Sequence, residues 1–208
     1  MKDFDINSWN RKTQYEFFKS YDDPFFNLTT NLNVTNLYKY CKNNDISFFL
    51  ACLHLALESA NEITEFRLRI IDDQVYVFDS IDIGSTVLNE DKSFSFCYFQ
   101  RKDSIVEFNV SGKEILENHH KENRFDANEN NEALIHCSFI PWFSFTSMKH
   151  ARDKEMEKNG IPKFVFGKYF VENNIKKMPF SIEAHHALMD GYHVGKFIQS
   201  FQERIDNL

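Results

Sequence analysis

Hydrophobic side chains recur at helical spacing in five segments of the chain. Residues 47–61 (SFFLACLHLALESAN) are so dense in apolar side chains at this spacing that they predict a buried helix. Weaker patterns predict a broken opening helix at residues 8–21, a short polar helix at 35–45 and an amphipathic helix at 104–120, in which Gly112 is unfavourable. A last helix, from about His193, presents one apolar face made of Val194, Phe197, Ile198, Phe201 and Ile205.

Alternating or β-rich runs between these segments predict strands. The clearest is a hairpin at residues 66–79 (FRLRIIDDQVYVFD), whose turn is centred on Asp72 and Asp73. Helices that alternate with antiparallel-looking strands, without a repeat or a linker, predict one α+β domain over residues 1–208, a large mixed sheet with helices packed on it. The other predicted strands are residues 24–34, 84–88, 93–99, 134–145, 163–171 and 178–184.

Composition narrows the class of protein. The chain of 208 residues has 23 Phe but only 2 Trp, enough for a thick apolar core and an apolar ligand pocket or subunit interface. Its formal net charge of −7 argues against a nucleic-acid partner, because binding phosphates along a nucleic acid needs a basic stripe. A small anionic ligand is still compatible, because a few local cations decide its binding.

The spacing of the cysteines and the N-terminal segment indicate the cellular compartment in which the protein works. The four cysteines are scattered without CxxC spacing, and the opening MKDFDINSW lacks the apolar region of a signal peptide. The longest apolar stretch, FFLACLHLALESA, is too short and too polar to cross a bilayer. We therefore expect a reduced cytoplasmic protein without disulfides and without a membrane partner.

Candidate chemistry is concentrated in SIEAHHALMDGYHVGKF, residues 181–197. A strand that ends near His185 and a helix that begins near His193 leave a connecting loop, in which Gly191 can take a positive φ and Asp190 can brace the turn. A neutral imidazole held by a hydrogen bond is a competent general base, but a structural histidine remains equally open on the residues alone. Adjacent histidines on a strand point to opposite faces and no ligand cluster accompanies them, so no metal is expected.

The motif HHxxxDG, here residues 185–191, resembles the signature of CoA-dependent acyltransferases. These include chloramphenicol acetyltransferases, the acyltransferase cores of 2-oxo acid dehydrogenase complexes and peptide-synthetase condensation domains. The longer HHALMDGYHVGKF is most similar to the chloramphenicol acetyltransferases, and so are SWNRK at 8–12, EFRLRIIDDQVYVFDS at 65–80 and CSFIPWFSFTS at 137–147. The resemblance covers nearly the whole chain.

The resemblance implies a two-layer sandwich of helices on a mainly antiparallel sheet, and a homotrimer with active sites between subunits. It implies transfer of acetyl from acetyl-CoA, as co-substrate, to a hydroxyl of chloramphenicol, with no metal. By position, His186 would be the general base, and the hydroxyl would attack the thioester directly. Asp190 would pair with Arg11 to hold the loop. Ser138 would donate a hydrogen bond to the oxyanion.

The resemblance also assigns binding residues. Lys168 would contact a CoA phosphate, with Tyr169 as a stacking surface. Five residues would form the acceptor side, namely Phe18, Phe26, Phe94, Met148 and His150.

The chain departs from the family's pattern at several positions. Val165 stands where a threonine is common, and SFFL at residues 47–50 replaces a common KFYP, with loss of a lysine. Asp22 stands at an apolar position of the acceptor side, where a buried carboxylate would need a partner. Two alternatives therefore remain: an acetyltransferase for another small alcohol or amine, and a binding protein on the same scaffold with weakened catalysis.

Overall fold

The computed structural model describes residues 1–122, 125, 127, 131–152 and 159–208. Among these residues, seven strands form one mixed sheet in the order β2-β10-β8-β7-β5-β6, and β9 pairs with β10 outside this path. The β5–β7 and β7–β8 pairings are parallel and the others antiparallel. The strands are β2 (Phe25–Asn33), β5 (Asp82–Leu88), β6 (Phe94–Phe99), β7 (Leu134–Ile140), β8 (Lys163–Gly167), β9 (Phe170–Glu172) and β10 (Ile175–His185).

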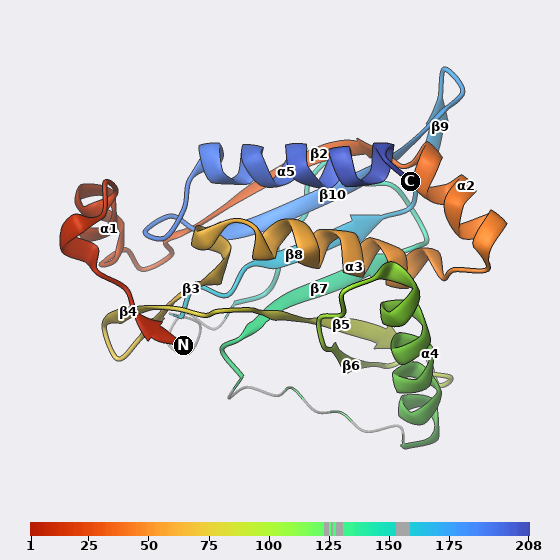
Figure 1. The fold of residues 1–208 in the computed structure, drawn as a ribbon, viewed down its shortest axis with the longest axis horizontal. Helices are drawn as coiled ribbons and strands as arrows, with labels where there is room; N and C mark the ends of the chain where they lie inside the picture. The colour runs from red at the N-terminus through yellow and green to blue at the C-terminus, as the bar shows by residue number, and fades with distance from the viewer. Residues whose placement is uncertain (123–124, 126, 128–130, 153–158) are drawn as a thin grey trace.

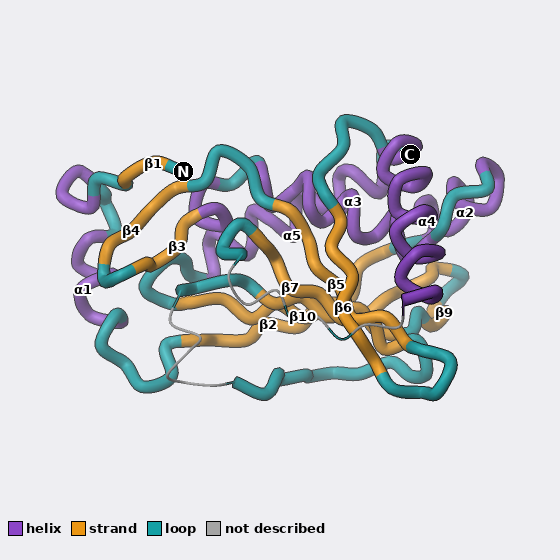
Figure 2. Tube along the Cα trace, turned by 90° about the horizontal axis from the view of Figure 1, so that it is seen from below, coloured by secondary structure: helices purple, strands orange, loops and turns teal. Residues whose placement is uncertain are grey.

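Helices cover one face of this sheet and form the second layer (Figures 1 and 2). Figure 1 shows α3 and α5 lengthwise over the strands, with α2 and α4 towards one end of the molecule and α1 at the other. The helices are α1 (Lys12–Phe18), α2 (Thr35–Asn44), α3 (Phe48–Asn61), α4 (Ile105–Glu122) and α5 (Gly191–Asp206), with 3₁₀ turns η1 (Ile6–Ser8) and η2 (Thr64–Arg67). A small sheet joins β1 (Lys2–Asp3), β4 (Gln74–Val77) and β3 (Leu68–Ile71).

The β3–β4 hairpin lies where the sequence predicts it, and a second hairpin has the same kind of turn. Asp72 and Asp73 link β3 to β4 with φ of 49° and 62°, and Asn173 and Asn174 link β9 to β10 with φ of 51° and 63°. Asp and Asn tolerate this left-handed conformation better than most residues, and it matches the twist of a two-residue hairpin. Two polar runs, FDANENNE at residues 125–132, which is typical of a loop, and the charged KHARDKEMEKNG at 149–160, lie partly outside the described residues.

The predicted phenylalanine core fills the space between the layers. Phe164, Phe166 and Phe180 point from β8 and β10 towards α5, where their rings meet Phe197 and Phe201 at centroid distances between 5.1 and 6.1 Å. Alternate side chains of a strand point to opposite faces, so Val165 and Ser181 point away from the helices. The sheet therefore has an apolar face and a face on which polar chemistry is possible.

Gly112 lies inside α4 and does not interrupt it, although glycine is unfavourable in a helix. A Cβ at this position would lie 2.6 Å from Cδ2 of Leu50 on α3. The glycine thus lets the two helices approach more closely than any side chain would allow.

All four cysteines are free and buried, in agreement with the expectation of no disulfides. Burial raises the pKa of Cys41 and Cys97 to about 11, and raises that of Cys52 and Cys137 as well. In the described part of the chain, no helix has the length and apolar character required to cross a membrane.

Candidate active site

The junction between β10 and α5 is built around Asp190. Its side chain caps α5 by accepting a hydrogen bond from the backbone N–H of Tyr192 (2.9 Å), and its own N–H donates to Nδ1 of His193 (3.2 Å). The helix therefore begins at Gly191, two residues before the predicted start. Gly191 is the first residue of the helix and does not adopt the positive φ that a glycine could take in a connecting loop.

Arg11 connects this junction to the start of the chain. Its guanidinium forms an ion pair with Asp190, as the sequence predicted, and its Nη2 donates to the backbone carbonyl of His186 (3.0 Å). Burial alone would raise the pKa of Asp190, but the Tyr192 N–H and the Arg11 charge outweigh burial and lower it. Arg11 thus holds a charged cap and the backbone of His186 with one buried side chain.

The ring of His186 is held between aromatic side chains. It stacks on Phe18 with the centroids 4.0 Å apart and the planes within 4°, and it meets Phe26 at 4.7 Å. Its backbone N–H donates to the carbonyl of Pro24 (2.8 Å). The residue is only half-buried, and Nδ1 is enclosed without a hydrogen-bond partner among the described residues. These contacts restrict the ring while part of the residue stays open to solvent.

The neighbouring His185 has a different environment. It is 2% exposed, its Nδ1 accepts a hydrogen bond from the N–H of Ala187 (3.2 Å), and Phe25 packs edge-on against its ring at 4.9 Å. Burial, together with the charges of Arg152 and His186, lowers the pKa of His185 to about 4. His185 is therefore a neutral, packed histidine at physiological pH, which matches the structural alternative that the sequence left open.

Ser138 lies on β7 and lines a cavity of about 710 Å³. Its Oγ accepts a hydrogen bond from Oγ1 of Thr86 (3.3 Å), which leaves the serine hydroxyl hydrogen free to donate elsewhere. Phe94 and Met148, both predicted acceptor-side residues, line the same cavity. Most of the remaining wall is apolar, so the cavity combines one hydroxyl pair with a hydrophobic surface.

Ser138 and His186 do not meet within one chain. Ser138 pairs with Val165 on β8, and Val165 pairs with Ser181 on β10, five residues before His186. Strand rise and strand spacing then separate the two backbones by roughly 15–20 Å. Phe18 and Phe26 accordingly lie with His186, whereas Phe94 and Met148 lie with Ser138.

His150 contacts neither the Ser138 cavity nor the His186 ring among the interactions of the described residues. Its backbone N–H instead donates to Glu183 Oε1 (2.8 Å), and Arg152 Nη2 donates to Glu183 Oε2 (2.7 Å). Sequence reasoning missed Glu183, although a lone acid in the otherwise apolar run of β10 was a signal for it. Asp22, whose burial would have been costly, is exposed.

The residues predicted to bind the cofactor lie at the other end of the sheet. Tyr169 meets Tyr38 at 5.5 Å and Phe48 at 6.4 Å, and the ammonium of Lys176 lies 4.9 Å from the Tyr169 ring centroid. Lys168 is exposed. These groups offer aromatic faces and cations, which suit a nucleotide carrying phosphates.

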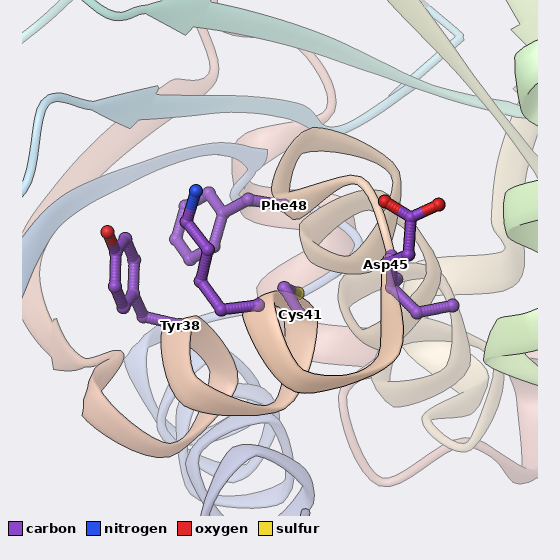
Figure 3. A pocket seen from close by; sticks show the side chains of 6 residues that line it. Tyr38, Cys41, Asp45 and Phe48 are labelled. Carbon is purple, nitrogen blue, oxygen red and sulfur yellow. The ribbon is translucent and has the colours of Figure 1, made fainter.

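A small pocket of about 170 Å³ adjoins this aromatic group (Figure 3). Figure 3 shows Tyr38 and Cys41 on α2 and Phe48 at the start of α3 around it. Ser47, where the family pattern has a lysine, caps α3 by accepting a hydrogen bond from the N–H of Leu50 (3.4 Å). Lys42 also lines the pocket and supplies a cation nearby.

Among the described residues, no group of three or more His, Cys, Asp or Glu side chains has an arrangement that could hold a metal ion.

Comparison with known proteins gives a match along the whole chain. The family model described as chloramphenicol acetyltransferase matches residues 1–202. The chloramphenicol acetyltransferase of Proteus mirabilis is 28% identical over 203 residues, covering 97% of this chain and 93% of the relative. A solved chloramphenicol acetyltransferase superposes with a TM-score of 0.91 at 28% identity, covering 98% of this chain and 99% of that one.

A more distant structure shares the fold alone. The probable dihydrolipoamide acetyltransferase of Listeria monocytogenes superposes with a TM-score of 0.70 at 12% identity, covering 94% of this chain and 89% of that one. These superpositions confirm the predicted α+β sandwich of the CoA-dependent acyltransferases.

Proposed function

Because this chain belongs to the chloramphenicol acetyltransferase family, we propose that it transfers the acetyl group of acetyl-CoA to a hydroxyl of chloramphenicol. The family membership confirms the resemblance on which the sequence prediction rested and the prediction of an acetyltransferase. The observation that carries the proposal is the setting of His186, the second histidine of the motif. Its ring is restrained by Phe18 and Phe26, yet the residue stays partly open to solvent.

His186 acts as the general base in the proposed reaction. It removes the proton of the acceptor hydroxyl while the oxygen attacks the carbonyl carbon of the thioester. The tetrahedral intermediate then collapses, the C–S bond breaks, and the CoA thiolate takes the proton from the imidazolium. No acyl-enzyme forms. Arg11 supports this step indirectly, because it fixes the His186 carbonyl and the charged Asp190 cap.

Ser138 stabilises the oxyanion of that intermediate. The Thr86 hydroxyl already donates to Ser138, so the serine hydrogen is free to point at the developing charge. One oriented donor of this kind is worth on the order of 3 kcal/mol in the transition state. Val165 pairs with Ser138 in register on β8 and, unlike a threonine, has no hydroxyl group to hold a water molecule. Of these two paired residues, only Ser138 can therefore donate a hydrogen bond from its side chain to the oxyanion.

The separation of Ser138 from His186 supports active sites shared between subunits, as in the homotrimer that the family resemblance implies. One thioester cannot touch both groups of a single chain, since their backbones are roughly 15–20 Å apart. A neighbouring copy supplies the missing half. The His186 side, with Phe18 and Phe26, then faces the Ser138 side, with Phe94 and Met148, of the next subunit.

Acetyl-CoA is the second substrate, and no metal takes part in the reaction. Tyr169 offers a stacking face for its adenine, and Lys168 is free in solvent to meet a phosphate. The enzyme acts in the cytoplasm, where acetyl-CoA is available.

Release of CoA tests the proposal against its alternatives. The purified chain is mixed with acetyl-CoA and with chloramphenicol, or with a panel of other small alcohols and amines. CoA released with chloramphenicol supports the proposed acceptor, and release only with another compound replaces that acceptor. If no acceptor leads to release of CoA although chloramphenicol binds, the chain is a binding protein on this scaffold.

The substitution His186→Ala should lower the turnover rate by about 10²–10⁴-fold, because a positioned base contributes this much. The melting temperature should fall by only a few degrees, because the ring loses its packing on Phe18 and Phe26 but Nδ1 has no hydrogen bond to lose among the described residues. Both quantities are measured on the same preparations. Substantial residual turnover would remove His186 from the role of base.

A further inference from the structure

Glu183 is a buried carboxylate three residues before His186. Its neighbours Ile182 and Ala184 belong to the core under the helices, so strand alternation turns Glu183 to the opposite face of the sheet. The residue is only 2% exposed. Burying a carboxylate is costly unless it is paired and hydrogen-bonded, so this acid must have strong partners.

Among the described residues, its hydrogen-bond and ion-pair partners come from one segment, residues 148–152. Oε1 accepts from the backbone N–H of His150 (2.8 Å), and Oε2 accepts from Nη2 (2.7 Å) and Nε (3.1 Å) of Arg152. Burial alone would raise the pKa of Glu183, but the contacts from His150 and Arg152 outweigh burial and lower it to about 2. Glu183 is therefore ionised throughout the pH range in which a histidine base works.

The same segment connects both halves of the proposed chemistry. At one end Met148 lines the Ser138 cavity. At the other end the Arg152 guanidinium lies over the ring of Phe25, 3.2 Å from its centroid, and Phe25 pairs with His185 across β2 and β10.

A second ion pair attaches the segment beside the base. Lys149 Nζ lies 3.0 Å from the carboxylate of Asp23, the residue before Pro24. Pro24 in turn accepts the hydrogen bond of the His186 backbone N–H. Met148 in the wall of the Ser138 cavity is thus linked, through residues 149–152, to the backbone of the same chain's His186, which serves a neighbouring site in the proposed trimer.

We propose that Glu183 is a positioning residue that fixes residues 148–152, and with them Met148 in the wall of the Ser138 cavity (the acceptor wall), and so determines how well the acceptor binds. This inference rests on the proposed function. Glu183 touches no reacting atom, and its effect passes through the His150 backbone and the Arg152 guanidinium. A displaced wall weakens acceptor binding but leaves the distant Tyr169 region, and hence acetyl-CoA binding, unchanged.

The test compares Glu183→Gln, Arg152→Gln and the double variant with the unaltered protein. Each single variant should raise KM for chloramphenicol about tenfold and leave KM for acetyl-CoA within twofold, because only the acceptor wall moves. In the double variant, the rise in KM for chloramphenicol should be smaller than the product of the rises in the two single variants, because each substitution removes the same Glu183–Arg152 interaction. The double variant also avoids the unpaired buried charge that each single variant leaves behind. It can therefore be measured where a single variant fails to fold. Glu62→Gln, which alters an exposed ion pair with Arg204, is the matched control and should change neither KM.

Amide hydrogen exchange keeps the test independent of turnover. Exchange at residues 148–152 should accelerate in the Glu183 variants and stay unchanged in Glu62→Gln. If the unaltered protein fails to acetylate chloramphenicol, the proposed function falls, and exchange alone then decides whether Glu183 fixes this segment. Equal changes in both KM values, or a loss of melting temperature with both KM values and the exchange unchanged, would overturn the inference and leave Glu183 a purely structural residue.

Discussion

His185 and His186 are adjacent in the sequence, yet their surroundings give them different chemistry. Strand alternation predicted that they would point apart, and the family resemblance predicted the role of base for His186. The residues alone could not show that Arg152 and the burial of β10 depress the pKa of His185, because Arg152 lies 33 positions earlier in the chain. The charge of a histidine thus depends on contacts that the local pattern does not contain.

Stability should fall as the pH drops from 6.5 towards 4, because His185 has a lowered pKa in the folded state. Its pKa is about 4 when folded, against an ordinary value of 6.5, so the unfolded chain binds the additional proton in this range. His185 contributes its full stability above pH 6.5, and protonation of the unfolded state removes up to about 3 kcal/mol by pH 4. Urea denaturation at several pH values measures the loss.

His185→Asn is the control for this titration. Its side-chain oxygen can still accept the Ala187 N–H, but it does not titrate, so the slope between pH 6.5 and 4 should flatten. Glu183 does not interfere, because its lowered pKa places its own loss of stability below pH 4.5, as the carboxylate takes up a proton towards pH 2. An equally steep slope in the Asn variant would contradict the assignment.

At the scale of elements, sequence patterns predicted the five α-helices and the β3–β4 hairpin of the described residues but not the reasons for their packing. The strongly apolar α3 and the one-sided α5 follow from periodicity alone. Arg69 illustrates what periodicity misses: it lies in the predicted hairpin but is fully buried, and it donates to the carbonyls of Phe66, Leu68, Glu132 and Leu134. Such a long-range set of acceptors exists only once β3 and β7 are assembled.

Gly112→Ala should destabilise the fold by about 1–2 kcal/mol, although alanine is the better helix former. The new methyl group would overlap Leu50 at 2.6 Å, and the overpacking outweighs the gain in propensity. Gly195, inside α5, has no atom within 4 Å of an added Cβ, so Gly195→Ala should instead stabilise by up to about 1 kcal/mol. Opposite signs in urea denaturation support the packing argument, and equal signs refute it.

At the scale of the whole molecule, the division of the site between chains is testable by mixing subunits. His186→Ala and Ser138→Ala chains are unfolded together and refolded at equal concentration. In a trimer with shared sites, about a quarter of the interfaces then combine an intact His186 with an intact Ser138, so activity should return to about a quarter of the unaltered level. Variants that stay as inactive together as they are apart would place each site within one chain.

The predictions at this scale depended on resemblance more than on pattern. Composition and alternation supported an α+β domain with a phenylalanine core, and these features are present. The role of Met148 and His150 could not be resolved in the same way, because the segment that carries them has no periodicity. Only the fold shows Met148 in the cavity and the His150 backbone on Glu183.

The burial of Cys41, Cys52, Cys97 and Cys137 makes free CoA easy to detect in the presence of this protein. Aromatic disulfide reagents react with thiolates that they can reach, and these four side chains are both enclosed and protonated at assay pH. The colour that develops then comes from the released coenzyme and not from the enzyme. A slow additional signal would come from the four cysteines in molecules that have unfolded and exposed them. One reagent would therefore report turnover and unfolding on separate timescales.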